Sequence, residues 1–166
     1  GGPDSPSLMA YTFRTEFTDV DTATRIDNVK QEIMVRYNDN KIYVQKATYA
    51  DSTFFKVFNY EFKYGNPLTA LTDENSMVLT EETATKIFGD QNPMGKVVRY
   101  DDRRDYIVKA VVKEPKGHSH FQFDMFMSRN SIQNVWMSNN PELTLWMLNE
   151  FSLLLPTARV HWAPVF

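Results

Sequence analysis

Three side chains that could ligate a metal ion lie close together in the second half of the sequence. His118 and His120 form an H-x-H pair, and Asp124 follows four residues later. In a β-strand, residues two apart share one face, so both imidazoles could reach the same ion, with His161 as a third ligand. This pattern permits a metal-dependent hydrolase. A loop whose histidines bond to backbone or water is the commoner origin of such a pattern, and no cysteine or carboxylate cluster elsewhere completes the set.

Paired carboxylates occur at Glu81–Glu82 and at Asp101–Asp102. General acid–base catalysis requires carboxylates that converge in a dry cleft. The first pair falls at a predicted helix start and the second in a predicted hairpin turn, where solvated acids are expected. We therefore interpret both pairs as structural.

Motifs for covalent or nucleotide chemistry are missing from the sequence. There is no cysteine and no G-x-S-x-G segment, and Ser119 between two histidines does not by itself make a catalytic triad. The Gly95-Lys96 pair precedes a predicted strand rather than a helix, so it is not a phosphate-binding loop. We expect neither an enzyme nor a cofactor site in this chain.

Tryptophans concentrate in the C-terminal third, at Trp136, Trp146 and Trp162. Exposed indole rings bind glycans, whereas most tryptophans pack in cores or interfaces. A free-standing module of the cell envelope that binds glycans or peptides through this region is therefore the alternative functional hypothesis.

Composition limits the class of protein. Of the 166 residues, 42% are hydrophobic and 23% charged, which is typical of a folded domain, and the net charge of −3 gives no reason to expect nucleic acid as a partner. No apolar run approaches the roughly 20 residues that span a bilayer. We interpret residues 1–7 as a flexible lead-in that begins with a remnant of expression cloning. Any membrane anchors are expected outside this sequence.

The pattern of apolar and turn residues predicts mostly strands, with few helices. A short helix is predicted from Asp21 to Val29, and a second helix over 80–88, with Thr80 as its cap and Gly89 at its end. A helical turn is predicted within 50–58. Strands are predicted at 8–17, 30–37, 41–49, 76–80, 96–100, 105–112, 118–128 and 150–155. In the strand over 105–112, Tyr106, Val108 and Ala110 are expected to share one face.

An ordered series of segments in the middle of the chain resembles a known family. The series comprises Tyr49–Phe58, Tyr64–Pro67, Leu71, Ser76–Thr80, Ala84, Phe88–Asp90, Asn92–Lys96, Tyr106–Val111 and Pro115–Asp124. It is similar to the MacB-like periplasmic core domain of FtsX-type ABC-transporter permeases, in the form abundant in Bacteroidetes. The stretch from Ala50 to Ser128 carries most of the resemblance.

The resemblance implies an α+β fold. A mixed α/β porter-like lobe would form from both chain ends, 8–50 plus 121–166, with a β-rich lobe, 51–120, inserted between them. It implies a non-catalytic domain on the periplasmic face of the inner membrane, as part of an integral membrane protein. Its partners would be its own transmembrane helices, a separate cytoplasmic ATPase that uses the ATP, a second permease copy, and a periplasmic adaptor or lipoprotein.

The resemblance also gives structural roles to particular residues. Hinge or seam positions are expected at Phe54, Phe55, Phe58, Gly65, Phe88, Gly89, Pro93 and Gly95. Gly89 and Gly95 are expected to adopt positive φ, and the three phenylalanines of 54–58 to join the lobes. The ends depart from the family pattern: the first 48 residues match loosely, and 156–166 lack the helix and closing strand expected there.

Overall fold

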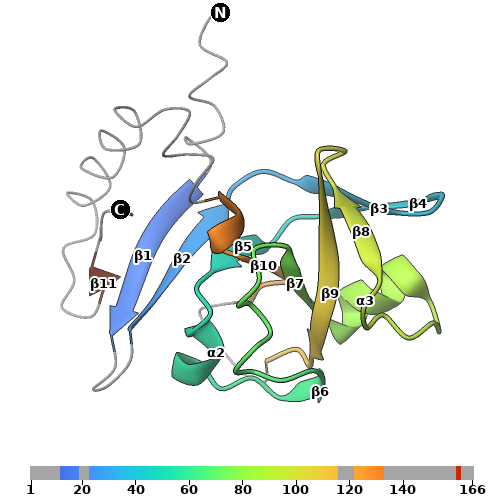
Figure 1. The fold of residues 1–166 in the computed structure, drawn as a ribbon. Helices are drawn as coiled ribbons and strands as arrows, with labels where there is room; N and C mark the ends of the chain where they lie inside the picture. The colour runs from blue at the N-terminus through green and yellow to red at the C-terminus, as the bar shows by residue number, and fades with distance from the viewer. Residues whose placement is uncertain (1–11, 19–22, 116–121, 133–159, 162–166) are drawn as a thin grey trace, which may run out of the picture.

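Eleven strands form one mixed sheet in the computed structural model, which describes residues 12–18, 23–115, 122–132 and 160–161 (Figure 1). The helices α2 (Phe54–Val57) and α3 (Glu81–Phe88) accompany the sheet in these ranges, and residues 130–132 are also helical. The fold is therefore α+β, as predicted. Within the described ranges no helix combines the length and hydropathy needed to cross a bilayer.

The strands do not follow chain order across the sheet, which runs β11-β1-β2-β5-β10-β7-β9-β8-β3-β4, with β6 paired to β9 off this path. Their bounds are β1 (Thr12–Thr18), β2 (Ala23–Val29), β3 (Ile33–Tyr37), β4 (Asn40–Val44), β5 (Ala47–Ala50), β6 (Phe62–Tyr64), β7 (Ser76–Thr80), β8 (Val97–Tyr100), β9 (Arg104–Val112), β10 (Met125–Ser128) and β11 (Val160–His161).

Segments from near the two ends of the chain meet in this sheet. β1 pairs antiparallel with β11, and β10 inserts between β5, to which it is parallel, and β7, to which it is antiparallel. The hairpin of β3 and β4 lies at the other end of the sheet, where β3 pairs with β8. Strands of both predicted lobes, 8–50 plus 121–166 and 51–120, take part in this one sheet. The division into two lobes stays a prediction.

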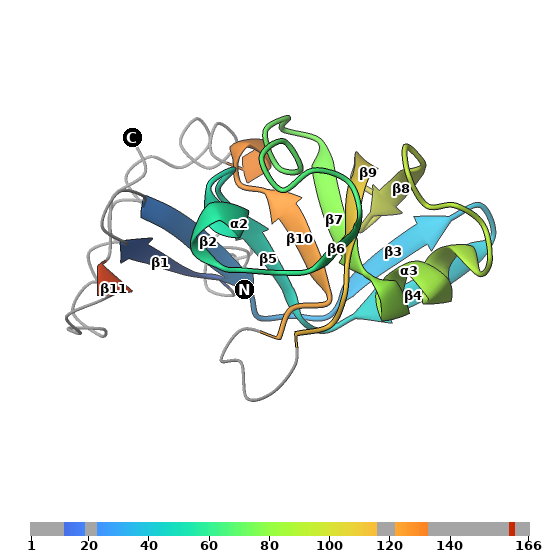
Figure 2. The same cartoon turned by 90° about the horizontal axis from the view of Figure 1, so that it is seen from below.

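The core is split into two apolar clusters on opposite faces of the sheet. In β7, Met77 and Leu79 belong to one cluster while Val78 belongs to the other, as strand alternation requires. The helix α3 covers the first cluster with Ala84, Ile87 and Phe88, and α2 covers the second with Phe54 and Phe55. Figure 2 shows these two helices beside the central strands. Burial on both faces explains why β5, β7 and β10 contain no exposed residue.

Most local predictions in the middle of the chain are confirmed. The predicted hairpin is β3 and β4, with Asn38 in its turn at φ 53°, and the predicted helix over 80–88 is α3. The Thr80 hydroxyl accepts the Thr83 N–H at 3.3 Å, which satisfies one of the free donors at the helix start. Gly89 and Gly95 adopt φ of 63° and 78°, so both expected positive φ values are confirmed.

The helix predicted from Asp21 to Val29 is wrong: Ala23–Val29 is strand β2. The strand pairs with both β1 and β5, and Thr24, Ile26 and Asp27 are completely buried between its neighbours. β-Branched residues favour strands, and here sheet pairing outweighs the capping signal at the start of the segment.

A β-bulge corrects the predicted faces of β9. Met77 of β7 is opposite Val108, but the next residue, Val78, is opposite Ala110. Lys109 is the extra residue, so Val108 and Ala110 point to opposite clusters instead of sharing a face. The sequence alternates evenly here and gave no sign of the extra residue.

Several predictions fall on other parts of the chain. The lead-in 1–7, the strand over 150–155 and residues 118–121 lie outside the described residues; of the strand predicted over 118–128, only Met125–Ser128 is a strand within the described part. The tail was expected to lack a closing strand, yet Val160–His161 pairs with Glu16–Phe17 as β11.

Candidate functional site

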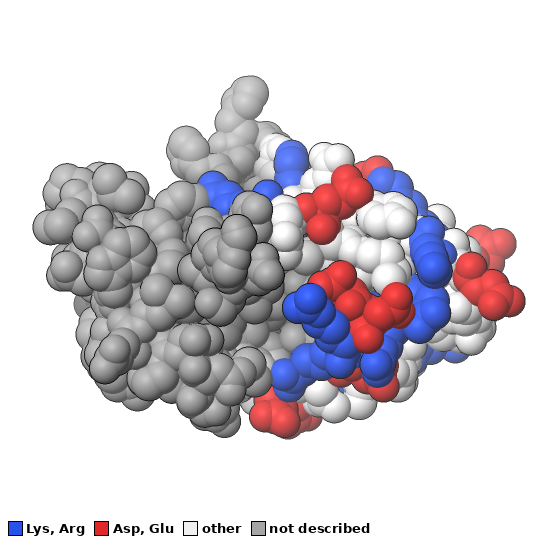
Figure 3. All heavy atoms as spheres, turned by 90° about the horizontal axis from the view of Figure 1, so that it is seen from above, with Lys and Arg blue, Asp and Glu red and all other residues white. Residues whose placement is uncertain are grey.

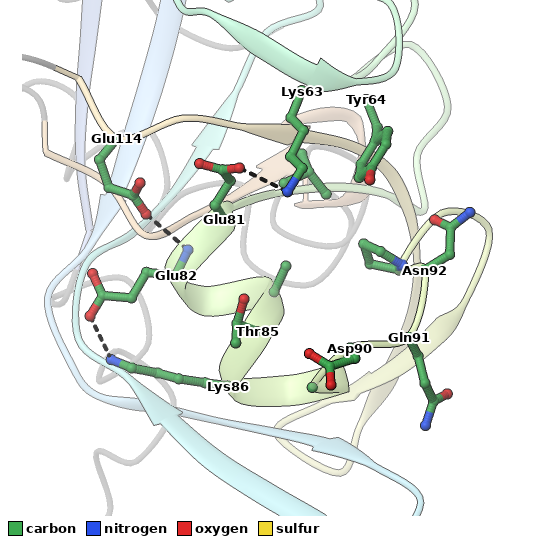
Figure 4. A pocket seen from close by; sticks show the side chains of 14 residues that line it. Lys63, Tyr64, Glu81, Glu82, Thr85, Lys86, Asp90, Gln91, Asn92 and Glu114 are labelled. Carbon is green, nitrogen blue, oxygen red and sulfur yellow. Dashed lines mark hydrogen bonds and ion pairs between the residues drawn. The ribbon is translucent and has the colours of Figure 1, made fainter.

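A cleft of about 770 Å³ opens beside α3, between the helix, strand β6 and the turn that follows the helix (Figure 4). Lys63 and Tyr64 enter it from β6, Glu81, Glu82, Thr85 and Lys86 from α3, and Asp90 to Asn92 from the turn. Val111 of β9 also lines the cleft, which therefore opens beside the β6–β9 pair. The helix α3 packs on β3, β4, β7 and β9, and the Asn40 side chain donates to the carbonyls of Lys86 and Ile87, both at 2.9 Å.

Local sequence explains the shape of this cleft. Thr80 starts α3 directly after the buried strand β7, which places Glu81 and Glu82 in the first turn, where the helix dipole favours acids. Gly89 then reverses the chain with a φ of 63°, and its N–H still donates to the Thr85 carbonyl at 2.8 Å. Pro93 is buried at the back of the turn.

Both lysines of the cleft are paired with glutamates. Lys63 binds Glu81 at 3.0 Å and Lys86 binds Glu82 at 3.2 Å, and the Glu82 N–H donates to Glu114 Oε1 at 2.9 Å (Figure 4). The hydrogen bond to Glu81 raises the pKa of the Lys63 ammonium group, which keeps it protonated. Carboxylates held in solvated pairs are poorly suited to proton transfer, since that role needs carboxylates that converge in a dry cleft. The contacts of Glu81 and Glu82 are thus with other side chains of the cleft and hold α3 to β6 and to Glu114.

The other pair of neighbouring acids, Asp101 and Asp102, is also solvated and paired. In the turn between β8 and β9, Asp101 and Asp102 adopt φ near 51° and 52°, and Asp102 binds Arg36 at 2.7 Å. On the face shown in Figure 3, basic and acidic side chains alternate rather than separate. No broad basic surface is seen on the described part of that face.

The expected seam residues of 54–58 lie in the second apolar cluster. Phe54 is completely buried and Phe55 nearly so, and Phe58 packs against them half-buried. Both buried rings contact Phe126 of β10, at centroid distances of 5.4 and 5.2 Å, and the cluster also contains Val78 and Ala110. The cluster of these rings therefore includes a residue of the predicted 8–50 plus 121–166 lobe, Phe126, and residues of the predicted 51–120 lobe, Val78 and Ala110.

Gly65 approaches the β9 bulge more closely than any side chain would allow. A Cβ atom added to it would lie 2.5 Å from the Cβ of Ala110 and 2.6 Å from the Lys109 carbonyl oxygen, and its φ is 95°. The other expected hinge positions are less crowded: Phe88 packs edge-on against Tyr37 at 4.7 Å, and a Cβ at Gly89 or Gly95 would meet no atom within 4 Å.

The metal hypothesis stays a prediction. His118 and His120 lie outside the described residues, and His161 is described only in the backbone of β11. Asp124 is half-buried beside β10, and burial raises the pKa of its carboxyl group. No group of three or more potential ligands occurs among the residues that the structure describes. Trp136, Trp146 and Trp162, on which the glycan hypothesis depends, also lie outside them.

Sequence reasoning missed the most deeply buried charges. Arg129, which follows β10, and Asp27 on β2 are 1% and 0% exposed, and their side chains form an ion pair at 2.8 Å. Arg129 also approaches Asp51 at 3.8 Å, and Asp51 binds Arg25 at 2.9 Å. The available signal was an acid within the apolar pattern of β2 and a base directly after the apolar β10, since buried charges require partners.

Comparisons with known proteins identify the fold. The family model described as the MacB-like periplasmic core domain matches residues 2–152. A domain of a protein from Porphyromonas gingivalis that is described as a permease is 24% identical, with a TM-score of 0.56, over 74% of this chain and 50% of that one. The chain thus spans half the length of that structure.

Two further structures cover nearly the whole chain. The extracellular domain of YknZ, a noncanonic ABC-type transporter from Gram-positive bacteria, is 13% identical with a TM-score of 0.54, over 95% of this chain and 84% of that one. The periplasmic region of MacB from Actinobacillus actinomycetemcomitans is 11% identical with a TM-score of 0.54, over 95% and 91%. No curated protein sequence matches the chain.

At these identities the solved structures show the fold, and the family model shows the family, because it matches most of the chain. The resemblance carried by the segments between Ala50 and Ser128 is confirmed. The chain belongs to the family of MacB-like periplasmic core domains, which form the extracytoplasmic part of ABC-transporter permeases of the inner membrane.

Proposed function

We propose that this domain is a non-catalytic ectodomain that transmits conformational change, driven by ATP hydrolysis in a separate cytoplasmic ATPase, to a substrate or partner outside the membrane. Its own transmembrane helices deliver the motion, and a second permease copy faces it. The extracytoplasmic partner is an adaptor or a lipoprotein. The domain itself holds no cofactor.

The observation that carries this proposal is the arrangement of the sheet. β1 and β11, from near the two ends of the chain, pair at one edge of the sheet (Figure 1), whereas the cleft lies beyond β10 and β7, where residues of β6 and β9 line it beside α3. Hydrogen-bonded strands connect that edge to β9 without interruption. A displacement applied to β1 and β11 would therefore reach the cleft through the sheet.

The cleft supports a mechanical rather than a chemical role. Each lysine that lines it is paired with a glutamate, and the described residues that line it include no histidine or cysteine. The remaining surfaces, such as the exposed Tyr64 ring at 42% exposure, suit contact with another protein better than bond-breaking.

Hydrogen–deuterium exchange in the full-length permease, reconstituted with its ATPase in nanodiscs, tests the proposal. Comparing the ATP-bound, ADP-bound and ATPase-inactive assemblies, we expect amide exchange to change on the surface of the domain while β7, β9 and β10 stay equally protected. Such a result means that the domain moves as a unit. Identical exchange across the whole domain in all three assemblies would contradict the proposal.

A further inference from the structure

The segment Ser128–Ile132 occupies the point in the sheet where strands from different parts of the chain meet. Its first residue, Ser128, is the last residue of β10, which lies between β5 on one side and β7 on the other. Ser128, Arg129 and Ser131 are almost completely buried although all three are polar. Buried polar groups must find partners, so their contacts define what this segment holds in place.

On the side of β2 and β5, the contacts are dominated by charge. The Arg129 guanidinium binds the Asp27 carboxylate of β2 at 2.8 Å, and the Arg129 N–H donates to the Ala50 carbonyl of β5 at 2.9 Å. The guanidinium also approaches Asp51 at 3.8 Å, and this aspartate binds Arg25 of β2 at 2.9 Å. Two acids and two bases thus alternate in the order Asp27, Arg129, Asp51 and Arg25, which joins the segment to β2 and to the residue after β5.

On the side of β9, the contacts are hydrogen bonds to one residue. The Tyr106 hydroxyl donates to Ser131 Oγ at 2.8 Å, and Arg104 Nη1 donates to the Ser131 carbonyl at 2.6 Å. Ser131 Oγ in turn donates to the Ser128 carbonyl at 2.7 Å, which fixes the segment's own conformation. Arg104 and Tyr106 both belong to β9, so Ser131 is hydrogen-bonded to the strand that pairs with β8 and contains the bulge.

A third set of contacts fixes the loop before β7. Ser128 Oγ donates to the Leu71 carbonyl at 3.0 Å, and Asn130 Nδ2 donates to the Thr72 carbonyl at 3.3 Å. Four consecutive residues, Ser128 to Ser131, therefore hold β2, β5, this loop and β9 through directional bonds. Apolar contacts tolerate sliding, whereas buried charge-assisted hydrogen bonds fix one geometry.

We infer that Ser128–Ile132 is the coupling element of the domain, which makes the β1–β2–β5 side and the β9–β8–β3 side move together. The inference rests on the proposed function, since it identifies where the transmitted displacement crosses the sheet. Asp27, Arg129, Ser131 and Tyr106 are positioning residues in this account. Removing their bonds leaves the backbone ladder β5–β10–β7–β9 in place and loosens the coupling between the two sides.

The chain itself provides the first test, because it contains no cysteine and can be labelled at chosen sites. Nitroxides at Ala23→Cys on β2 and Tyr43→Cys on β4, both exposed, report the distance between the two sides. We expect a narrow distance distribution in the parent chain and a broader one in the Asp27→Asn and Tyr106→Phe variants. Tyr106→Phe is the milder change and keeps the test valid if Asp27→Asn does not fold.

A matched control separates coupling from general loss of stability. Phe88→Leu loosens the contact of α3 with Tyr37 and touches none of the bonds of Ser128–Ile132. Each variant is measured the same number of degrees below its own melting temperature. Under that condition Phe88→Leu should keep the narrow distance distribution. If the coupling variants are as narrow as the control, or the control broadens as much as they do, the inference is wrong.

The reconstituted permease with its ATPase separates failure of the inference from failure of the proposed function. With single labels at Ala23→Cys or Tyr43→Cys in each copy, both inter-copy distances should shift on ATP binding in the parent. In Tyr106→Phe, the shift at Ala23→Cys should persist and the shift at Tyr43→Cys should become smaller than in the parent. Retention of both shifts at their parental size overturns the inference alone, and no shift at either label in the parent overturns the proposed function and the inference with it.

Discussion

The guanidinium Nε of Arg129 lies 2.8 Å from the Oδ2 atom of Asp27, across a sequence separation of 102 residues, and both side chains are buried. The pair connects β2 to the segment after β10. A buried ion pair is seldom the most stable solution at a site, because desolvation costs about as much as the attraction returns. Its contribution is a fixed geometry between distant segments.

Breaking this pair from one side should be far more harmful than replacing both partners. Arg129→Met removes the guanidinium from the buried Asp27 carboxylate, and we expect the free energy of unfolding to fall by about 3–5 kcal/mol. The double variant Asp27→Leu/Arg129→Met should recover most of that loss in urea melts. A double variant no more stable than Arg129→Met would show that the other contacts of these side chains, and not the charge, hold the site.

Gly65 should tolerate no side chain, because its Cβ position is occupied by Ala110 and by the Lys109 carbonyl. Gly65→Ala adds this clash to the strain of a φ of 95°, and we expect a loss of at least about 2 kcal/mol in urea melts. Gly95→Ala is the matched control, since its φ is 78° but no atom lies within 4 Å of the new Cβ. Equal losses in the two variants would exclude close approach to the bulge as the reason for glycine.

The buried phenylalanines on α2 and α3 should contribute strongly to stability. Phe55 and Phe88 are 7% and 4% exposed, one in each apolar cluster. Truncation to alanine creates a cavity, and Phe55→Ala and Phe88→Ala should each cost about 3–5 kcal/mol. Val97→Ala, at a side chain 49% exposed, should change the melting temperature little. An unchanged melting temperature in either phenylalanine variant would show that its ring is not part of the core.

The domain should lose stability in strong alkali because of its buried tyrosines. Burial raises the pKa of Tyr49 and Tyr100 well above 10, and their hydroxyls lie 2.9 Å apart; burial also raises the pKa of Tyr60 to about 12. Above pH 10 the unfolded chain releases these protons and the folded chain keeps them. The stabilisation is therefore complete below pH 10 and is lost as the pH rises toward the folded-state values.

Urea melts between pH 9 and pH 12 would measure this loss. The variant Tyr49→Phe/Tyr100→Phe should show a smaller decline of the unfolding free energy with pH than the parent. Tyr43→Phe, at a ring 63% exposed, serves as the control and should follow the parent curve. A parent curve that stays flat across this range would refute the assignment.

Elements defined by local signals were predictable from the sequence. The Thr80 cap, the acids after it and Gly89 fix the ends of α3 within the chain itself, and Asn38-Asp39 marks the β3–β4 turn. The family resemblance was available for the same reason, because it depends on turn glycines and apolar segments in a fixed order.

Features that depend on distant partners were not predictable. β2 is a strand because it lies between β1 and β5, the bulge at Lys109 appears only in the register with β7, and Gly65 is constrained by Ala110. The Arg129–Asp27 pair joins segments whose proximity no local pattern reveals. In each case tertiary contacts decide the outcome, and propensity carries little weight.

The measurement that tests the central claim most directly is the displacement of the domain during the ATP cycle. A nitroxide at Tyr43→Cys in each copy of the reconstituted permease reports the distance between the β4 edges of two domains. We predict that this distance shifts between the ADP-bound and ATP-bound assemblies, and that an ATPase unable to bind ATP abolishes the shift. A distance that is the same with ATP, with ADP and without nucleotide would contradict the account.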